Sequence, residues 1–129
     1  MKQLAICENH LYQKAYRRGT RSSRGSLCVY VLRDRRAQAI KKANPQKKMM
    51  NRVGISASKK IGGAVERNRA KRVVREAYRQ IEAEYGVKKG WLVVIVCRKE
   101  ATVLKMQDVK RDMQYCLAKA GLLAEGGAE

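Results

Sequence analysis

Residues 64–81 most constrain the fold, because cationic and apolar side chains separate onto two sides of one predicted helix. At about 100° per residue, a basic stripe forms along one side. Its members are Arg67, Lys71, Arg72, Arg75 and Arg79. The other side consists of small and β-branched residues, namely Ala70, Val73, Val74, Ala77 and Ile81. Because such a helix buries its apolar side, we expect a helix from about Gly63 to Tyr85 that packs on a sheet, with its cations outward.

The charges of this helix are not balanced. Six Lys and Arg residues lie between positions 67 and 79, and the only acidic residues nearby are Glu66 and Glu76. A solvated surface helix alternates the sign of its charges, whereas like charges one turn apart repel each other unless a polyanion faces them. The whole chain shares the bias, with a net charge of +19. The pattern therefore favours a nucleic-acid partner over a merely solvated surface.

The length and the hydropathy pattern limit the class of protein. A chain of 129 residues suits one domain, and we expect an ordered core over about 9–121 with a disordered tail at 124–129. No run of about eighteen apolar residues is present, and the first residues lack a signal-peptide pattern. We therefore expect a cytoplasmic protein that neither spans a membrane nor binds one.

No protein-borne catalytic or metal site is predicted. The chain has one histidine, its carboxylates are scattered, and no Cys-x-x-Cys pair occurs. The four cysteines are far apart in sequence, and we expect them to be small buried side chains in a reducing compartment: Cys7, Cys28, Cys97 and Cys116.

Periodicity predicts the remaining elements. We expect helices over 9–18 and 106–120, and strands over 27–32, 51–56 and 91–97. Residues 91–97 are apolar on both faces and should be central in the sheet. Residues 51–56 alternate, with Arg52 on the polar side, and should be half-buried. Residues 20–25 fit either a loop or a short edge strand, and 33–50 should form a basic excursion between strands.

Tyr12 and Tyr16 lie four residues apart on the first predicted helix, beside Lys14, Arg17 and Arg18. Core packing is one interpretation of this pair. A stacking platform for unpaired bases is the other, because tyrosine rings flanked by cations suit single-stranded RNA. Both interpretations are compatible if each ring is partly buried.

The stretch from Arg52 to Arg79, RVGISASKKIGGAVERNRAKRVVREAYR, resembles the signature of the bacterial ribonuclease P protein subunit. The Arg-Asn-Arg core at 67–69 directly follows Ser-x-Ser-Lys-Lys-x-Gly, and the match extends over roughly 9–120. The resemblance implies an α+β fold, a single-domain α-β-β-β-α-β-α sandwich with a left-handed β-α-β crossover, like that of a ribosomal protein domain. Pattern alone would favour the common right-handed crossover.

The resemblance also implies a function. The family protein binds the catalytic RNA of ribonuclease P and the 5′ leader of precursor tRNA, and the RNA removes the leader with Mg²⁺, without an obligatory protein partner. The residues implied to bind the RNA subunit are Arg67, Asn68, Arg69, Lys71, Arg72 and Arg75. Those implied to bind the leader are Tyr12, Lys14, Tyr16, Arg17, Tyr30, Ser56 and Lys59.

Two alternatives remain at this point. A structural ribosomal protein of similar β-α-β type would bind ribosomal RNA without processing it. A DNA-binding basic helix is weaker, because neither a dimerising heptad zipper nor a helix-turn-helix partner is present.

Overall fold

The computed structural model describes residues 4–5, 9–33, 51–88 and 90–123. One five-stranded sheet organises them, in the order β1-β4-β5-β3-β2. The strands are β1 (Leu4–Ala5), β2 (Thr20–Arg24), β3 (Leu27–Arg33), β4 (Arg52–Ser56) and β5 (Trp91–Cys97). The helices are α1 (Asn9–Arg18), α3 (Ala64–Glu84) and α4 (Met106–Lys119), with short 3-10 turns η1 (Lys59–Ile61) and η2 (Lys99–Thr102). After β1, the order is the predicted α-β-β-β-α-β-α.

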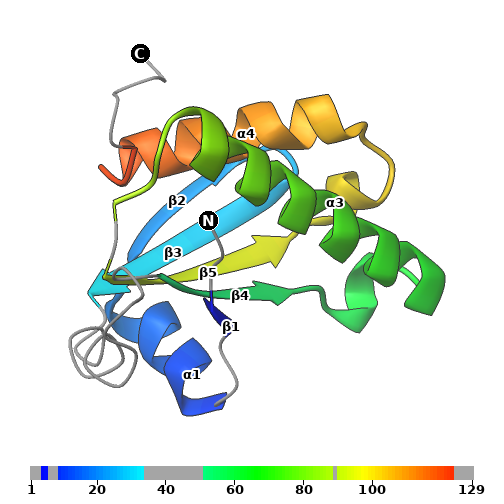
Figure 1. Cartoon of the computed structure of the whole chain (residues 1–129). Helices are drawn as coiled ribbons and strands as arrows, with labels where there is room; N and C mark the ends of the chain where they lie inside the picture. Colours follow the sequence, from blue (N-terminus) through cyan, green and yellow to red (C-terminus); the bar gives the residue numbers. More distant parts are fainter. Residues whose placement is uncertain (1–3, 6–8, 34–50, 89, 124–129) are drawn as a thin grey trace.

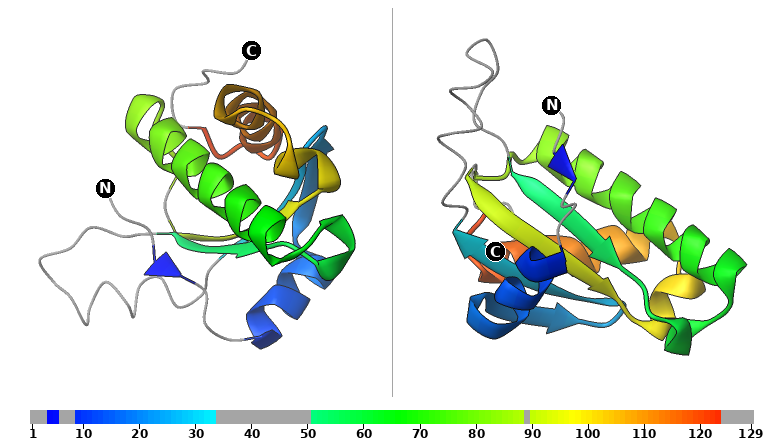
Figure 2. Two further views of the ribbon diagram at one scale, coloured as in Figure 1. Left: turned by 90° about the vertical axis from the view of Figure 1, so that its right-hand side faces the viewer. Right: turned by 90° about the horizontal axis from the view of Figure 1, so that it is seen from below.

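The helices form layers on both faces of the sheet. Helices α3 and α4 cover one face, and α1 lies alone on the other (Figure 1). Turning the molecule keeps α1 apart from the α3–α4 layer (Figure 2). Strand β5 is central, as its two apolar faces predicted, because it pairs with β3 on one side and β4 on the other. Of the two interpretations of residues 20–25, the edge strand is confirmed: within the described residues, β2 pairs only with β3.

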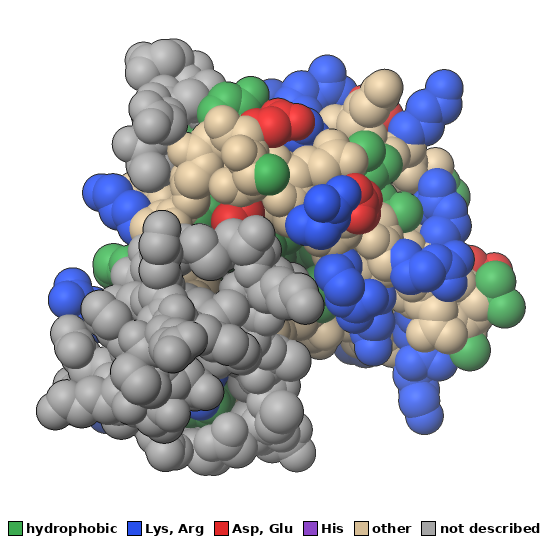
Figure 3. Space-filling model, viewed as in Figure 1, with side chains coloured by type: hydrophobic (Ala, Val, Ile, Leu, Met, Phe, Trp, Pro, Cys, Tyr) green, Lys and Arg blue, Asp and Glu red, His purple; other side chains and the backbone are tan. Residues whose placement is uncertain are grey.

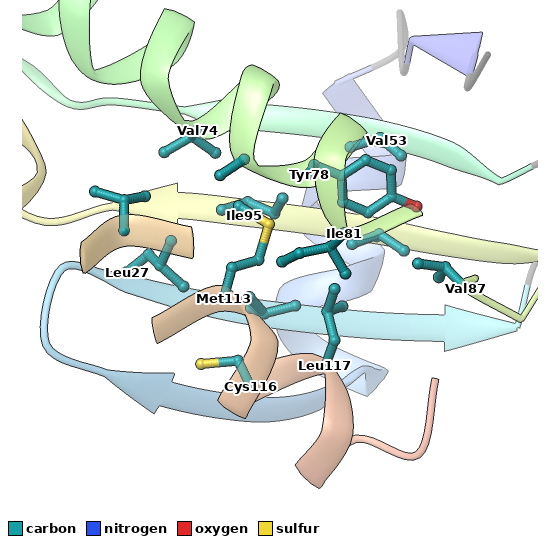
Figure 4. Close-up of a cluster of buried hydrophobic side chains, with 14 of the residues drawn as sticks. Leu27, Val53, Val74, Tyr78, Ile81, Val87, Ile95, Met113, Cys116 and Leu117 are labelled. Carbon is teal, nitrogen blue, oxygen red and sulfur yellow. The ribbon is translucent and has the colours of Figure 1, made fainter. Parts of the chain in front are cut away.

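The main core lies between the sheet and the helices α3 and α4 (Figure 4). From α3 it takes the predicted apolar side together with Tyr78, which is fully buried. Met113, Cys116 and Leu117 of α4 lie beside these residues on the same face of the sheet. A smaller cluster joins Leu11 and Ala15 of α1 to the opposite face of β5. Burial of α3 on this layer leaves its basic side free to face solvent.

The connection between β4 and β5 has the rarer hand. The two strands are adjacent and parallel, and α3 joins them across the face that carries the main core. Seen with α3 toward the viewer and both strands pointing upward, β5 lies to the left of β4 (Figure 4). A right-handed crossover would place it to the right, so this crossover is left-handed. The general preference for right-handed crossovers is therefore wrong here, and the expectation from the family resemblance is confirmed.

Strand β4 is more buried than its alternating pattern predicted. Arg52 was expected on a polar side, but it is only 7% exposed, and Gly54 is also buried. Gly54 lies under the Tyr12 ring, and the start of β4 is flanked by β1, a strand that was not predicted. It pairs in parallel with the start of β4, placing Leu4 opposite Arg52.

Asn51 fixes the end of α3 to the sheet. Its buried amide nitrogen donates to the Tyr78 hydroxyl at 3.2 Å and to the Lys88 carbonyl at 2.9 Å. Its amide oxygen accepts from the Trp91 backbone N–H at 3.0 Å. One side chain thus ties the start of β4, the C-terminal half of α3 and the start of β5, which sets the orientation of the basic helix.

The described part of the chain agrees with most other predictions. Cys28, Cys97 and Cys116 are buried free thiols, as expected. Burial raises the pKa of Cys97 and of Cys116 to about 11, so both stay protonated at neutral pH. Cys7, residues 34–50 and the tail at 124–129 lie outside the described residues, so their predictions stay predictions.

Candidate nucleic-acid interface

The outward side of α3 is a surface of positive charge (Figure 3). Arg72 and Arg75 are exposed, and neither bonds to any other residue within the described ranges. Arg79 differs, because its Nε donates to Glu76 Oε1 at 3.0 Å and Gln80 also binds that carboxylate. The Arg79 hydrogen bonds lower the pKa of Glu76 to about 2. The unbalanced charge therefore lies in the first half of the helix rather than along its whole length.

Arg69 points away from the basic stripe. Its terminal nitrogens donate to three backbone carbonyls at the end of η2, those of Ala101, Thr102 and Leu104, at 3.4, 3.0 and 3.1 Å. At about 200° from Arg67 on the helical wheel, Arg69 borders the opposite edge of the apolar side. It therefore fixes η2 to α3, a role that its membership in the Arg-Asn-Arg motif did not reveal.

Lys71 lies at the other border of the apolar side, beside α1. It lines an open hollow of about 470 Å³ together with two tyrosines and the end of β4. The lining residues are Tyr12, Gln13, Tyr16, Ile55, Ser56, Ala57 and Lys71. Lys71 was predicted to lie on the RNA-subunit surface and the tyrosines on the leader surface, but the structure brings them to the same cavity. Gln13, Ile55 and Ala57 were not foreseen, since nothing in their type marks them.

The position of Tyr12 depends on a glycine. A Cβ at Gly54 would lie 2.4 Å from the Tyr12 hydroxyl oxygen and 2.6 Å from its ring carbon. Only a residue without a side chain lets the ring lie this close to β4. Gly54 therefore lets Tyr12, a lining residue of the hollow, pack directly against β4.

Tyr16 and Tyr30 form the aromatic part of the same face. Their ring centroids are 5.1 Å apart with an interplanar angle of 71°, an edge-to-face contact. Tyr16 is 37% exposed, while Tyr12 and Tyr30 are half-buried. Burial, followed by contact with Cys28, raises the pKa of Tyr30, so its hydroxyl is protonated at neutral pH. The rings are thus partly packed and partly accessible, which combines both sequence interpretations.

Of the other predicted leader residues, only some line the hollow. Ser56 lines it, whereas Lys14 and Arg17 of α1 and Lys59 of η1 are not among its lining residues. Arg17 and Lys59 are exposed, and Lys14 is partly so. Asn68 is exposed on α3, and Arg67 is half-buried. The structure therefore joins Tyr12, Tyr16, Ser56 and Lys71 in one cavity, and its lining does not include Lys14, Arg17, Tyr30 or Lys59.

Neither a metal centre nor a membrane span is found in the described ranges. No group of three or more His, Cys, Asp or Glu side chains is placed to hold a metal ion there. None of the described helices is long and apolar enough to cross a membrane.

Comparisons with known proteins identify the relatives of this chain. A family model described as Ribonuclease P matches residues 1–121. A ribonuclease P protein component of Dehalococcoides mccartyi is 42% identical over 87 residues, which are 67% of this chain and 69% of that protein. One from Clostridium botulinum is 33% identical over 122 residues, 95% of this chain and 98% of that protein.

Solved structures share the fold. The ribonuclease P protein of Staphylococcus aureus superposes with a TM-score of 0.71 at 23% identity, covering 95% of this chain and 99% of that one. The protein of Thermotoga maritima gives a TM-score of 0.65 at 21% identity, covering 91% and 96%. These likenesses confirm the predicted fold class, and the family match decides against the ribosomal and DNA-binding alternatives.

Proposed function

Because the chain belongs to the bacterial ribonuclease P protein family, we propose that its basic helix binds the RNA subunit and that the hollow beside α1 binds the 5′ leader of precursor tRNA. This chain is the protein subunit of a ribonucleoprotein endoribonuclease that matures the 5′ end of tRNA. The partner of the chain is the ribonuclease P RNA.

The observation that carries the proposal is the position of Lys71. It belongs to the outward side of α3 and also lines the hollow with Tyr12 and Tyr16. One continuous surface thus passes from clustered cations to accessible aromatic rings. Cations bind phosphates without reading sequence, and tyrosines stack on unpaired bases. A folded RNA on α3 and a single strand on α1 would then lie next to each other.

Within the RNA-binding set, the residues divide by role. Arg67, Lys71, Arg72 and Arg75 offer charge to phosphates, and Asn68 offers an exposed amide. Arg69 acts indirectly, since it holds η2 against α3. On the substrate side, Tyr12, Tyr16 and Tyr30 offer rings and Ser56 a hydroxyl, while Lys14 and Arg17 of α1 and Lys59 of η1 add charge for the leader backbone.

We place catalysis on the RNA subunit, with Mg²⁺ bound there. The protein would lower the Mg²⁺ requirement by adding positive charge where the two RNAs meet. We further infer that it works in the cytoplasm and needs no other protein subunit.

Cleavage of precursor tRNA by ribonuclease P RNA at low Mg²⁺, with and without this protein, tests the function. The double variant Arg72→Ala plus Arg75→Ala should lose stimulation and RNA affinity. Lys88→Ala plus Lys119→Ala removes the same charge from exposed positions outside α3 and serves as the control. Equal losses in both variants would show that total charge, rather than the α3 surface, binds the RNA.

The leader surface has its own test. Tyr16→Ala should weaken binding of precursor tRNA and leave mature tRNA unaffected, because stacking on one base contributes about 1–3 kcal/mol. An unchanged ratio of the two affinities would rule out a leader-binding role for the aromatic face.

A further inference from the structure

The sheet face beside α1 extends well beyond the hollow. Strand register places Ser56, Val96, Cys28 and Ser23 in one row across β4, β5, β3 and β2. The neighbouring row contains Gly54, Val94, Tyr30 and Arg21. Helix α1 lies over this second row, because Tyr12 contacts Gly54 and Tyr16 contacts Tyr30. The first row is therefore the strip next to α1, and it starts at Ser56 in the hollow.

This strip has a measurable length. It crosses from β4 to β2, which are three strand spacings apart in the sheet order, or about 14 Å. Ser56, Val96 and Ser23 are half-buried, whereas Cys28 between Val96 and Ser23 is buried, so the strip is partly accessible at both ends and closed at Cys28. Its beginning is marked by a cation, Lys71, which lines the hollow.

A second cation, Arg21, belongs to the neighbouring row but reaches the far part of the strip through Cys28. Arg21 of the edge strand β2 is exposed and lies directly opposite Tyr30 of β3. Its Nε donates to the Cys28 sulfur at 3.2 Å, and Cys28 is only 4% exposed. No carboxylate in the described ranges pairs with Arg21. The guanidinium is thus anchored beside the aromatic rings while its charge is not offset.

The other arginine of β2 shows that this placement is specific. Arg24 is three residues from Arg21 on the same strand, so its side chain lies on the opposite face of the sheet, the one covered by α4. There its Nε is 3.8 Å from Asp112 and its guanidinium lies 4.4 Å from the centre of the Tyr115 ring. Strand β2 therefore gives one arginine to each face, and of the two only Arg21 shares the sheet face that carries Tyr30 and is covered by α1.

We propose that Arg21, held in place by Cys28, binds a phosphate of the precursor tRNA leader at the far end of the strip, so that Lys71 and Arg21 bracket the row of tyrosines. A guanidinium suits this task because its planar fork matches phosphate oxygens. The leader crosses the strands beside α1, with bases on Tyr12, Tyr16 and Tyr30. This inference rests on the proposed leader-binding function and extends it by a specific residue.

The test uses the reconstituted holoenzyme and a series of precursor tRNAs whose leaders are shortened one nucleotide at a time. Wild type should gain affinity when the leader becomes long enough to reach β2, and Arg21→Ala should lose that gain several-fold while matching wild type on shorter leaders. With long leaders, Arg21→Ala should also reduce the slope of log affinity against log salt by about 0.7, the value for one contact to a single strand.

Two further variants separate position from charge. Cys28→Ala keeps the cation and removes its sulfur acceptor, so it should lose part of the affinity at the same leader lengths with the salt slope unchanged. Arg24→Ala removes the same charge from the same strand and should behave as wild type at every leader length, with thermal unfolding used to confirm that each variant is folded.

Two results would overturn the proposal. One is an Arg21→Ala protein equal to wild type on all leaders, and the other is an equal loss with long leaders, short leaders and mature tRNA. Tyr16→Ala distinguishes the cause of the first result. If Tyr16→Ala retains its leader-dependent loss, only the role of Arg21 fails. If Tyr16→Ala also has no effect, the proposed leader site itself fails.

Discussion

Arg69 is the residue for which direct RNA contact and an indirect, structural role can be distinguished most clearly by experiment. Its guanidinium donates to three carbonyls at the end of η2. Hydrogen bonds from a charged donor contribute about 1.5–3 kcal/mol each at most, and these are only partly buried and of uneven length. We therefore expect Arg69→Ala to lower the free energy of unfolding by about 2–4 kcal/mol in total. For a domain of this size, that reduces Tm by roughly 5–20 °C.

The salt dependence of RNA binding should respond differently from the stability. Each phosphate contact adds about 0.7–0.9 to the slope of log affinity against log salt. Because Arg69 is engaged with η2, Arg69→Ala should weaken binding of ribonuclease P RNA without changing this slope, measured well below Tm. Arg72 is the matched control, since it lies three residues along the same helix and is exposed. Arg72→Ala should lower the slope by about 0.7–0.9 and leave Tm almost unchanged.

Arg69→Lys completes the comparison. Lysine keeps the charge but lacks the planar fork that reaches several carbonyls, so its Tm should fall with that of Arg69→Ala. An Arg69→Ala protein with wild-type Tm and a salt slope reduced as in Arg72→Ala would refute the structural role of Arg69. This role would also be refuted if Arg69→Lys restored both stability and affinity, because charge alone would then be sufficient.

Two other substitutions follow from the contacts of the site. Glu76→Gln should raise affinity for the RNA subunit and steepen the salt dependence of binding, because it releases Arg79 from its ion pair. The pKa of Glu76 is lowered to about 2, so the wild-type carboxylate loses its charge only as the pH falls toward that value. The gain in affinity should therefore be constant across neutral pH. Gly54→Ala should displace Tyr12, lower Tm and weaken leader-dependent binding measured on precursor tRNA, whereas an unchanged Tm would show that the ring shifts without resistance.

The sequence was sufficient for whatever depends on local periodicity. The apolar side of α3 is buried as the helical wheel predicted, and the double-sided apolar run at 91–97 is the central strand. The pairing of Tyr12 with Tyr16 on one helix face also follows from spacing alone. These features need only the geometry of one element at a time.

Contacts between distant segments could not be predicted in this way. The buried Arg52 is paired with a two-residue strand, which is too short to produce a pattern of its own. Arg69 and η2 are more than thirty residues apart, and the same motif letters describe an arginine facing solvent or one facing carbonyls. The contact of Tyr12 with Gly54 likewise required the sheet and α1 to be placed together.

The central place of β5 also bears on how the chain is made. Strand β5 separates β3 from β4, yet it follows both in the sequence, after the whole of α3. During synthesis, the chain emerges from its N-terminus, so the cationic helix leaves the ribosome before the strand that completes the sheet beneath it. For that interval its arginines are present without the surface that orients them, close to a large excess of ribosomal RNA. A nascent chain ending before Trp91 should therefore bind RNA indiscriminately, and discrimination should begin only when β5 enters the sheet.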